Sequence, residues 1–158
     1  MIRPATPADV PVILELIRAL AVYEKLEADV VIRAGDLADH LFGPRPYAEC
    51  SLAEDAGIVV GFALFFHNYS TFRGKPGIYL EDLFVRPENR GQGHGKALFA
   101  ELARLAVERG CARLEWAVLD WNAPSIAFYE RLGAKSLSEW TTYRLTADSM
   151  VALAQSEQ

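Results

Sequence analysis

A glycine-rich loop offers the clearest chemistry in this sequence of 158 residues. The loop, Arg90-Gly91-Gln92-Gly93-His94-Gly95-Lys96, joins a segment typical of a buried strand to a segment with helical periodicity. Its glycines allow successive backbone N–H groups to turn toward one point, and the helix that follows adds its free N-terminal donors and the positive end of its dipole. We therefore expect the loop to bind a diphosphate. A glycine-rich turn that only caps the helix is the structural alternative.

Other chemistries find less support in the sequence. The loop has neither the Gly-Lys-Ser/Thr ending of a nucleotide P-loop nor the full G-x-G-x-x-G spacing of a dinucleotide fold. The histidines, His40, His67 and His94, are far apart, and no cysteine or histidine pair has the spacing of a zinc site. Cys50 and Cys111 are expected to stay reduced in an intracellular chain, which excludes a disulfide framework. We expect no bound metal.

Composition limits the class of protein that carries this loop. Hydrophobic residues make up 51 % of the chain, charged residues 23 %, and the mean hydropathy is +0.08, as in an ordinary globular domain. The sequence predicts a single domain over 1–158. Sixteen basic and twenty-one acidic residues give a net charge of −5, which disfavours nucleic acid as a partner. The short apolar stretches and the absence of a secretory signal predict a cytoplasmic protein without a membrane span.

Strands and helices alternate around the loop. Thr6-Pro7-Ala8-Asp9 is typical of a helix start, and apolar residues at a 3.6-residue period follow it to Ala21. The remaining pattern predicts helices near 34–42, 96–110 and 124–132 and after Thr146, and strands at 47–54, 58–69, 78–85 and 113–119, with two short β-like stretches around Ser136 and Tyr143. Together they indicate an α/β layer fold with a mixed sheet.

Several separated motifs resemble one known family, the GNAT-type N-acetyltransferases. Arg90-x-x-Gly93-x-Gly95, after a strand that ends at Val85, is similar to the acetyl-CoA pyrophosphate signature of that family. Further matches, in the same order as in the diamine (spermidine/spermine) acetyltransferase branch, are Arg3-Pro4-Ala5-Thr6, Tyr23-Glu24, Tyr79-Leu80-Glu81-Asp82, Asp120-Trp121-Asn122 and Phe128-Tyr129-Glu130-Arg131-Leu132-Gly133-Ala134. The segments 69–74 and 117–122 look closer to the thialysine N-epsilon-acetyltransferase type.

The resemblance implies a fold, a reaction and a set of partners. The GNAT fold is a mixed, mostly antiparallel sheet flanked by helices on both faces. The implied enzyme moves an acetyl group from acetyl-CoA to a primary amine of a small diamine or a thialysine- or lysine-like amino acid, by direct attack and as a homodimer. A protein N-terminal or lysine acetyltransferase is one alternative, and a non-catalytic acyl-CoA-binding module is another.

The resemblance also assigns roles to individual residues. Because an alkyl ammonium has a pKa of about 10.4, the amine must lose a proton before it attacks. Glu81 is the implied general base, acting through water, although it could serve only to attract the cation. Asp82 would point to the opposite face of a regular strand. Tyr129 is the implied general acid that protonates the departing sulfur, and packing its ring in the core is the structural alternative.

Binding residues follow from the same motifs. The implied acceptor contacts are Tyr23, Glu24 and Glu81. For Tyr23 and Glu24, an exposed charge at the end of the helix is the alternative. The implied coenzyme contacts are Leu83, Phe84, Val85, Arg90, Gly91, Gln92, Gly93, His94, Gly95, Lys96, Asn122, Pro124, Ser125 and Tyr129. Asn122 is also a good helix N-cap.

The sequence departs from the polyamine branch in the loop before the strand at 78–85. Ser70 and Phe72 replace an acidic residue and a tryptophan there, and a C-terminal acidic contact is replaced near Thr141. Arg73 nearby suggests an acceptor that carries a carboxylate, whereas a solvated loop arginine is the alternative.

Overall fold

The computed structural model describes residues 1–156 and contains two compact units. The first is Met1–Ala117 and the second begins at Val118. Each is described by itself. In residues 1–156 no helix is long and apolar enough to cross a lipid bilayer.

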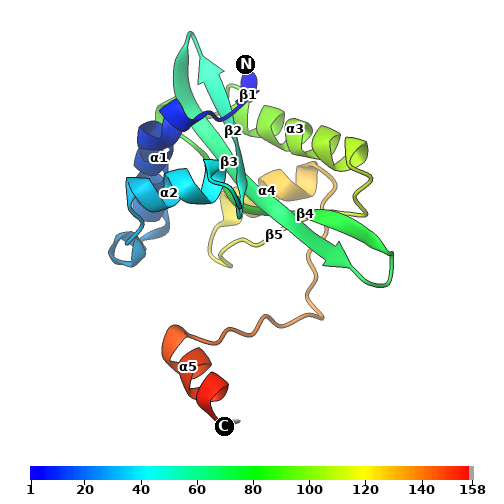
Figure 1. Ribbon diagram of the computed structural model, residues 1–158. Helices are drawn as coiled ribbons and strands as arrows, with labels where there is room; N and C mark the ends of the chain where they lie inside the picture. The colour runs from blue at the N-terminus through cyan, green and yellow to red at the C-terminus, as the bar shows by residue number, and fades with distance from the viewer. Residues whose placement is uncertain (157–158) are drawn as a thin grey trace. The chain divides into compact units, whose positions relative to one another are not determined.

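A five-stranded sheet forms the centre of the first unit (Figure 1). The strands lie in the order β1-β2-β3-β4-β5, and their bounds are Ile2–Pro4, Glu49–Asp55, Ile58–Ser70, Lys75–Val85 and Leu114–Trp116. Neighbouring strands from β1 to β4 are antiparallel, and β4 and β5 are parallel. This confirms the expected mixed, mostly antiparallel sheet. Ala56 and Gly57, with φ of 47° and 81°, make the tight turn between β2 and β3.

Helices cover both faces of this sheet. On one face lie α1 and α2 and on the other lies α3 (Figure 1). The helical segments of the unit are η1 (Pro7–Asp9), α1 (Val10–Glu24), η2 (Glu27–Asp29), α2 (Ala34–Phe42), η3 (Pro87–Asn89) and α3 (His94–Glu108). The apolar faces of α1 and α2 pack on strand residues such as Cys50, Leu52, Phe62 and Phe84. Burial there raises the pKa of the Cys50 thiol to about 12.

The start of the first helical segment is fixed as its sequence predicts. Thr6 and Asp9 form a capping box, in which the Asp9 carboxylate accepts from the Thr6 backbone N–H at 2.7 Å. Arg3 donates to both oxygens of Asp9 at 2.8 Å and to Glu54 at 2.7 Å, which ties β1 to the helix and to β2. The Arg3 guanidinium holds the pKa of the Asp9 carboxyl well below its usual range.

The second unit contains α4 (Ala123–Arg131) and α5 (Ala147–Gln155). The expectation of strands around Ser136 and Tyr143 is wrong, because residues 134–146 form no strand in the structure. A strand needs a neighbour to take its backbone hydrogen bonds. Within the described part of this unit, no other segment is extended and paired to supply one.

Candidate active site

The glycine-rich loop has the backbone geometry of an anion nest. Gly91 and Gly93 have φ of 77° and 90°, which side-chain-bearing residues adopt only with strain, and Gly93 is the N-cap of α3. In residues 1–156 no acceptor takes the N–H groups of residues 91–96. A Cβ built on Gly91 or Gly93 would meet no atom within 4 Å. The loop therefore presents unpaired donors to open space, as a diphosphate requires.

Side chains of the loop differ in their surroundings. Gln92 donates to the Glu88 carbonyl at 3.4 Å, and Lys96 is exposed. His94 opens α3 with a half-buried ring whose buried Nε2 has no hydrogen-bond partner in the described chain. The main chain of the loop and the exposed Lys96 side chain are thus free to meet an anion.

Strand β4 extends past its parallel neighbour toward the loop. The pairing between β4 and β5 covers Ile78–Leu80 in β4, whereas β4 continues to Val85 and stays paired with β3 to that end. The side of Leu83–Val85 that would face β5 is consequently without a paired strand in the described structure. A ligand with amide groups could add to this edge, which is the role that the resemblance implies for Leu83, Phe84 and Val85.

A β-bulge at Glu81 lies where β4 stops pairing with β5. Leu64 pairs with Asp82 and Phe65 with Leu80, so Glu81 is an extra residue in β4 with no partner in β3. Its side chain is exposed. Asp82 was placed on the opposite face only for a regular strand, and the bulge removes that condition.

Asp82 is a candidate site residue that the sequence reasoning missed. Its β3 partner Leu64 packs against the core on the α1 side of the sheet, where Glu24 ends α1. Burial, and then the nearby charges of Glu81 and Glu24, raise the pKa of Asp82 to about 6. Burial also raises the pKa of Glu24. The structure thus brings together three carboxylates, two of them predicted, where a cation would relieve their mutual repulsion.

Arg90 and Tyr23 lie together beside this acidic group. The Arg90 guanidinium carbon is 4.7 Å from the centroid of the Tyr23 ring and 5.4 Å from that of Phe84. Arg90 Nε donates to the Val85 carbonyl at 3.0 Å. The side chain thus folds back on β4 and α1.

The remaining predicted residues belong to the second unit. Asn122 is buried and its Oδ1 accepts from the Ser125 N–H at 3.4 Å, which confirms its N-cap role. Pro124 is exposed in the first turn of α4, and Ser125 is half-buried. Tyr129 is also half-buried, with its ring centroid 5.7 Å from that of Phe128. A half-buried ring packed on a neighbour fits either reading of Tyr129.

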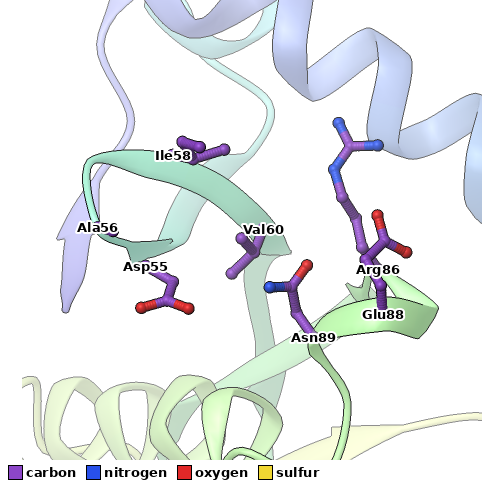
Figure 2. A pocket seen from close by; sticks show the side chains of 7 residues that line it. All are labelled: Asp55, Ala56, Ile58, Val60, Arg86, Glu88 and Asn89. Carbon is purple, nitrogen blue, oxygen red and sulfur yellow. The ribbon is translucent and has the colours of Figure 1, made fainter.

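A pocket of about 380 Å³ lies elsewhere in the first unit, between the β2–β3 turn and η3 (Figure 2). Its lining residues are Asp55, Ala56, Ile58, Val60, Arg86, Glu88 and Asn89. None of the predicted site residues is among them. Arg86 donates to Glu15 at 2.7 Å, so its charge is already paired. Among residues 1–156 no three His, Cys, Asp or Glu side chains are grouped so as to hold a metal ion.

Comparison with known proteins identifies the family of the chain. The family model described as "Acetyltransferase (GNAT) family" matches residues 14–134. The chain belongs to this family. Among curated relatives, the thialysine N-epsilon-acetyltransferase of Bos taurus is 41 % identical over 165 residues, covering 98 % of this chain and 96 % of the relative. The L-ornithine N5-acetyltransferase NATA1 of Arabidopsis thaliana is 35 % identical over 197 residues, covering 96 % and 86 %.

Solved structures show the same fold. The integron cassette protein VCH_CASS6 from the mobile metagenome of V. cholerae superposes with a TM-score of 0.82 at 26 % identity, covering 99 % of this chain and 98 % of its own. An aminoglycoside acetyltransferase, meta-AAC0020, superposes with a TM-score of 0.77 at 19 % identity, covering 92 % and 96 %. This GNAT protein is an amine N-acetyltransferase, and enzymes of the family use acetyl-CoA as co-substrate. The comparisons favour neither the protein-acetylating nor the non-catalytic alternative.

Proposed function

We propose that this GNAT enzyme acetylates the side-chain amine of a small basic amino acid or diamine. The observation that carries the proposal is the group of three carboxylates, Glu24, Glu81 and Asp82, whose repulsion and burial raise the pKa of Asp82 to about 6. A primary ammonium placed among them would neutralise the excess negative charge. The curated relatives named for thialysine and ornithine act on amino acids with such a side chain.

The coenzyme would lie along the β4 edge and the glycine-rich loop. Acetyl-CoA supplies a thioester as the acetyl donor, and its diphosphate matches the free N–H groups of residues 91–96. The unpaired edge of Leu83–Val85 would hold the amide-bearing arm and direct an N–H at the thioester oxygen. Asn122, Pro124 and Ser125 are proposed as further coenzyme contacts, with Asn122 keeping its capping bond.

Proton transfer is proposed for Glu81 and Tyr129. Glu81, exposed at the bulge, would take the proton of the bound ammonium through a water molecule. Tyr129 would give a proton to the departing sulfur, because a phenol with a pKa near 10 is protonated at neutral pH. Direct attack by the amine needs no covalent enzyme intermediate, in keeping with the raised thiol pKa of Cys50.

The residues of the β3–β4 turn are the basis for a proposed preference among these acceptors. Ser70 and Phe72 stand where the polyamine branch has an acidic residue and a tryptophan, and Arg73 is exposed beside them. A guanidinium there would favour an acceptor with a carboxylate. We therefore expect lysine, ornithine or thialysine to be preferred over spermidine.

An amine panel tests the proposal. Purified protein with acetyl-CoA would be offered lysine, ornithine, thialysine, spermidine and a lysine-containing peptide, with products identified by mass spectrometry. The expected result is acetylation of a free amino acid with the highest kcat/KM. A strong preference for spermidine would overturn the amino-acid assignment, and acetylation of the peptide alone would overturn the small-molecule assignment.

Four further features are proposed with the activity. The enzyme would act in the cytoplasm, without a metal and without nucleic acid as a partner. It would be a homodimer, because the segment 134–146 of the second unit exposes large apolar side chains that a second copy would cover: Trp140, Tyr143 and Leu145 are 75 %, 92 % and 55 % exposed.

A further inference from the structure

Arg90 is the first residue of the diphosphate-binding motif, but its side chain is held by other parts of the protein. Its Nε donates to the carbonyl of Val85 at 3.0 Å, at the end of β4. Its guanidinium lies 4.7 Å from the Tyr23 ring centroid, within the distance of a cation–π contact. The Phe84 ring, 4 % exposed, is the second aromatic neighbour, at 5.4 Å. The side chain is therefore engaged by three groups of the protein.

The groups around Arg90 are adjacent to the candidate acceptor carboxylates. Tyr23 directly precedes Glu24, the last residue of α1. Phe84 follows Asp82 by two positions in β4, so both point to the same face of the strand. Arg90 thus joins the glycine-rich loop to the two elements that carry Glu24 and Asp82.

A contact that holds the end of α1 in place would affect the position of Glu24. Lys25 follows Glu24 in the left-handed region, with φ of 62°, and ends the helix. A carboxylate at a helix terminus moves as the last turn frays, unless tertiary contacts fix that turn. The stacking of Arg90 on Tyr23 is one such contact.

We propose that Arg90 is a positioning residue that couples the coenzyme loop to the acceptor carboxylates, and that the diphosphate is bound by the backbone of the loop instead. This inference rests on the proposed function. A coenzyme that orders the loop would hold Arg90 against Tyr23 and so fix Glu24 for the amine. Arginine suits the task because its planar group can stack on a ring while Nε donates in its own plane.

Replacement of Arg90 tests this role by separating the two substrates. In Arg90→Met we expect the KM of the amine acceptor to rise about three- to fivefold, as loss of a cation–π contact at an exposed arginine would cause, with kcat changed less than about twofold. The Kd of coenzyme A, measured by calorimetry, should stay within about twofold, and its dependence on salt should be unchanged. Arg86→Met is the matched control, since Arg86 pairs with Glu15, and both constants should then stay at wild-type values.

Variants of Tyr23 make the test specific to the stacking contact. Tyr23→Leu should raise the acceptor KM about as much as Arg90→Met, and the double variant should be no worse than either single one. Tyr23→Phe keeps the ring and should retain most of the acceptor affinity. Multiplicative effects in the double variant would overturn the proposal.

The coenzyme measurement distinguishes failure of the inference from failure of the proposed function. A coenzyme A Kd that rises tenfold in Arg90→Met with a weaker salt dependence, at constant acceptor KM, would make Arg90 a diphosphate ligand and overturn the inference alone. Wild-type protein that neither binds coenzyme A nor acetylates an amine would overturn both.

Discussion

At the scale of single residues, the carboxylates Glu24, Glu81 and Asp82 differ in what burial does to them. Asp82 is the most affected, because it lies beneath α1 with two like charges near it. Its pKa of about 6 makes it neutral in mild acid and ionised at neutral pH. Glu81 at the bulge stays exposed, where a water molecule can reach it. This difference supports the proposal that Asp82 binds the cation and Glu81 transfers the proton.

Acceptor binding should therefore depend on pH through Asp82. As pH rises from 5 to 7.5 the carboxyl ionises, while the side-chain ammonium of lysine, with a pKa of about 10.4, stays charged. We expect the affinity for lysine, in the presence of coenzyme A without an acetyl group, to increase over this range with a midpoint near pH 6. Calorimetry at several pH values measures it.

The variant Asp82→Asn should abolish this pH dependence and weaken binding at pH 7.5 by at least about tenfold, because a charge-assisted contact is lost. Asp29→Asn removes an exposed carboxylate of η2 and should change neither the pH dependence nor the affinity at pH 7.5. An unchanged pH profile in Asp82→Asn would contradict the assignment.

Tyr129 should act as an acid and not only as a packed ring. Tyr129→Phe removes one hydroxyl and keeps the ring, so we expect kcat to fall by at least about 100-fold, as loss of general acid catalysis does. The Kd of acetyl-CoA should change less than about twofold. Tyr143→Phe, at an exposed phenol of the same unit, should leave both values unchanged. Normal turnover in Tyr129→Phe would remove the acid role.

At the scale of elements, the junction between β4 and α3 forms the candidate diphosphate site. Its conformation requires positive φ at Gly91 and Gly93, and its donors are free because a helix begins there. The sheet contributes by ending β5 early, so that β4 presents an unpaired edge next to the loop.

Alanine variants of two glycines with similar φ can separate the effect of this conformation on binding from its effect on stability. Gly93 and Gly57 have φ of 90° and 81°, and a Cβ on either would meet no atom within 4 Å. Alanine at either position costs about 1 kcal/mol of stability in the left-handed region, so Gly93→Ala and Gly57→Ala should lower Tm by similar amounts. Only Gly93→Ala should also weaken coenzyme A binding, by about tenfold in calorimetry. Equal coenzyme affinity in the two variants would count against the nest.

The sequence predicted most elements of the first unit, and the failures have physical causes. Local signals sufficed for the Thr6–Asp9 cap, the amphipathic helices and the glycine loop. The role of Asp82 was missed because a bulge of one residue depends on how β4 pairs with β3, which periodicity does not reveal. The direction of the Arg90 side chain depends in part on the ring of Tyr23, which is far away in the sequence. Strands around Ser136 and Tyr143 were wrongly expected because alternation alone supplies no pairing partner.

At the scale of the whole molecule, the proposed homodimer is tested at exposed apolar side chains of the segment 134–146. We expect sedimentation velocity to give a dimer for the wild-type protein. Trp140→Ser with Tyr143→Ser should shift it toward monomer, because both side chains are exposed in the described chain. Val31→Ser with Val107→Ser removes two valines that are 85 % and 81 % exposed elsewhere and should leave the dimer intact. A monomeric wild type would exclude this assembly.

The two cysteines differ in exposure, so their alkylation can report the unfolding of the native chain. Cys50 is 7 % exposed within the sheet, whereas Cys111, after α3, is only half-buried. Alkylating reagents attack the thiolate, so Cys50 should remain unmodified until the strands separate. Brief pulses of iodoacetamide in increasing urea, followed by peptide mapping, would measure the modification of each cysteine without any introduced label. Cys111 should be modified at lower urea than Cys50, and modification of Cys50 would report the opening of the sheet.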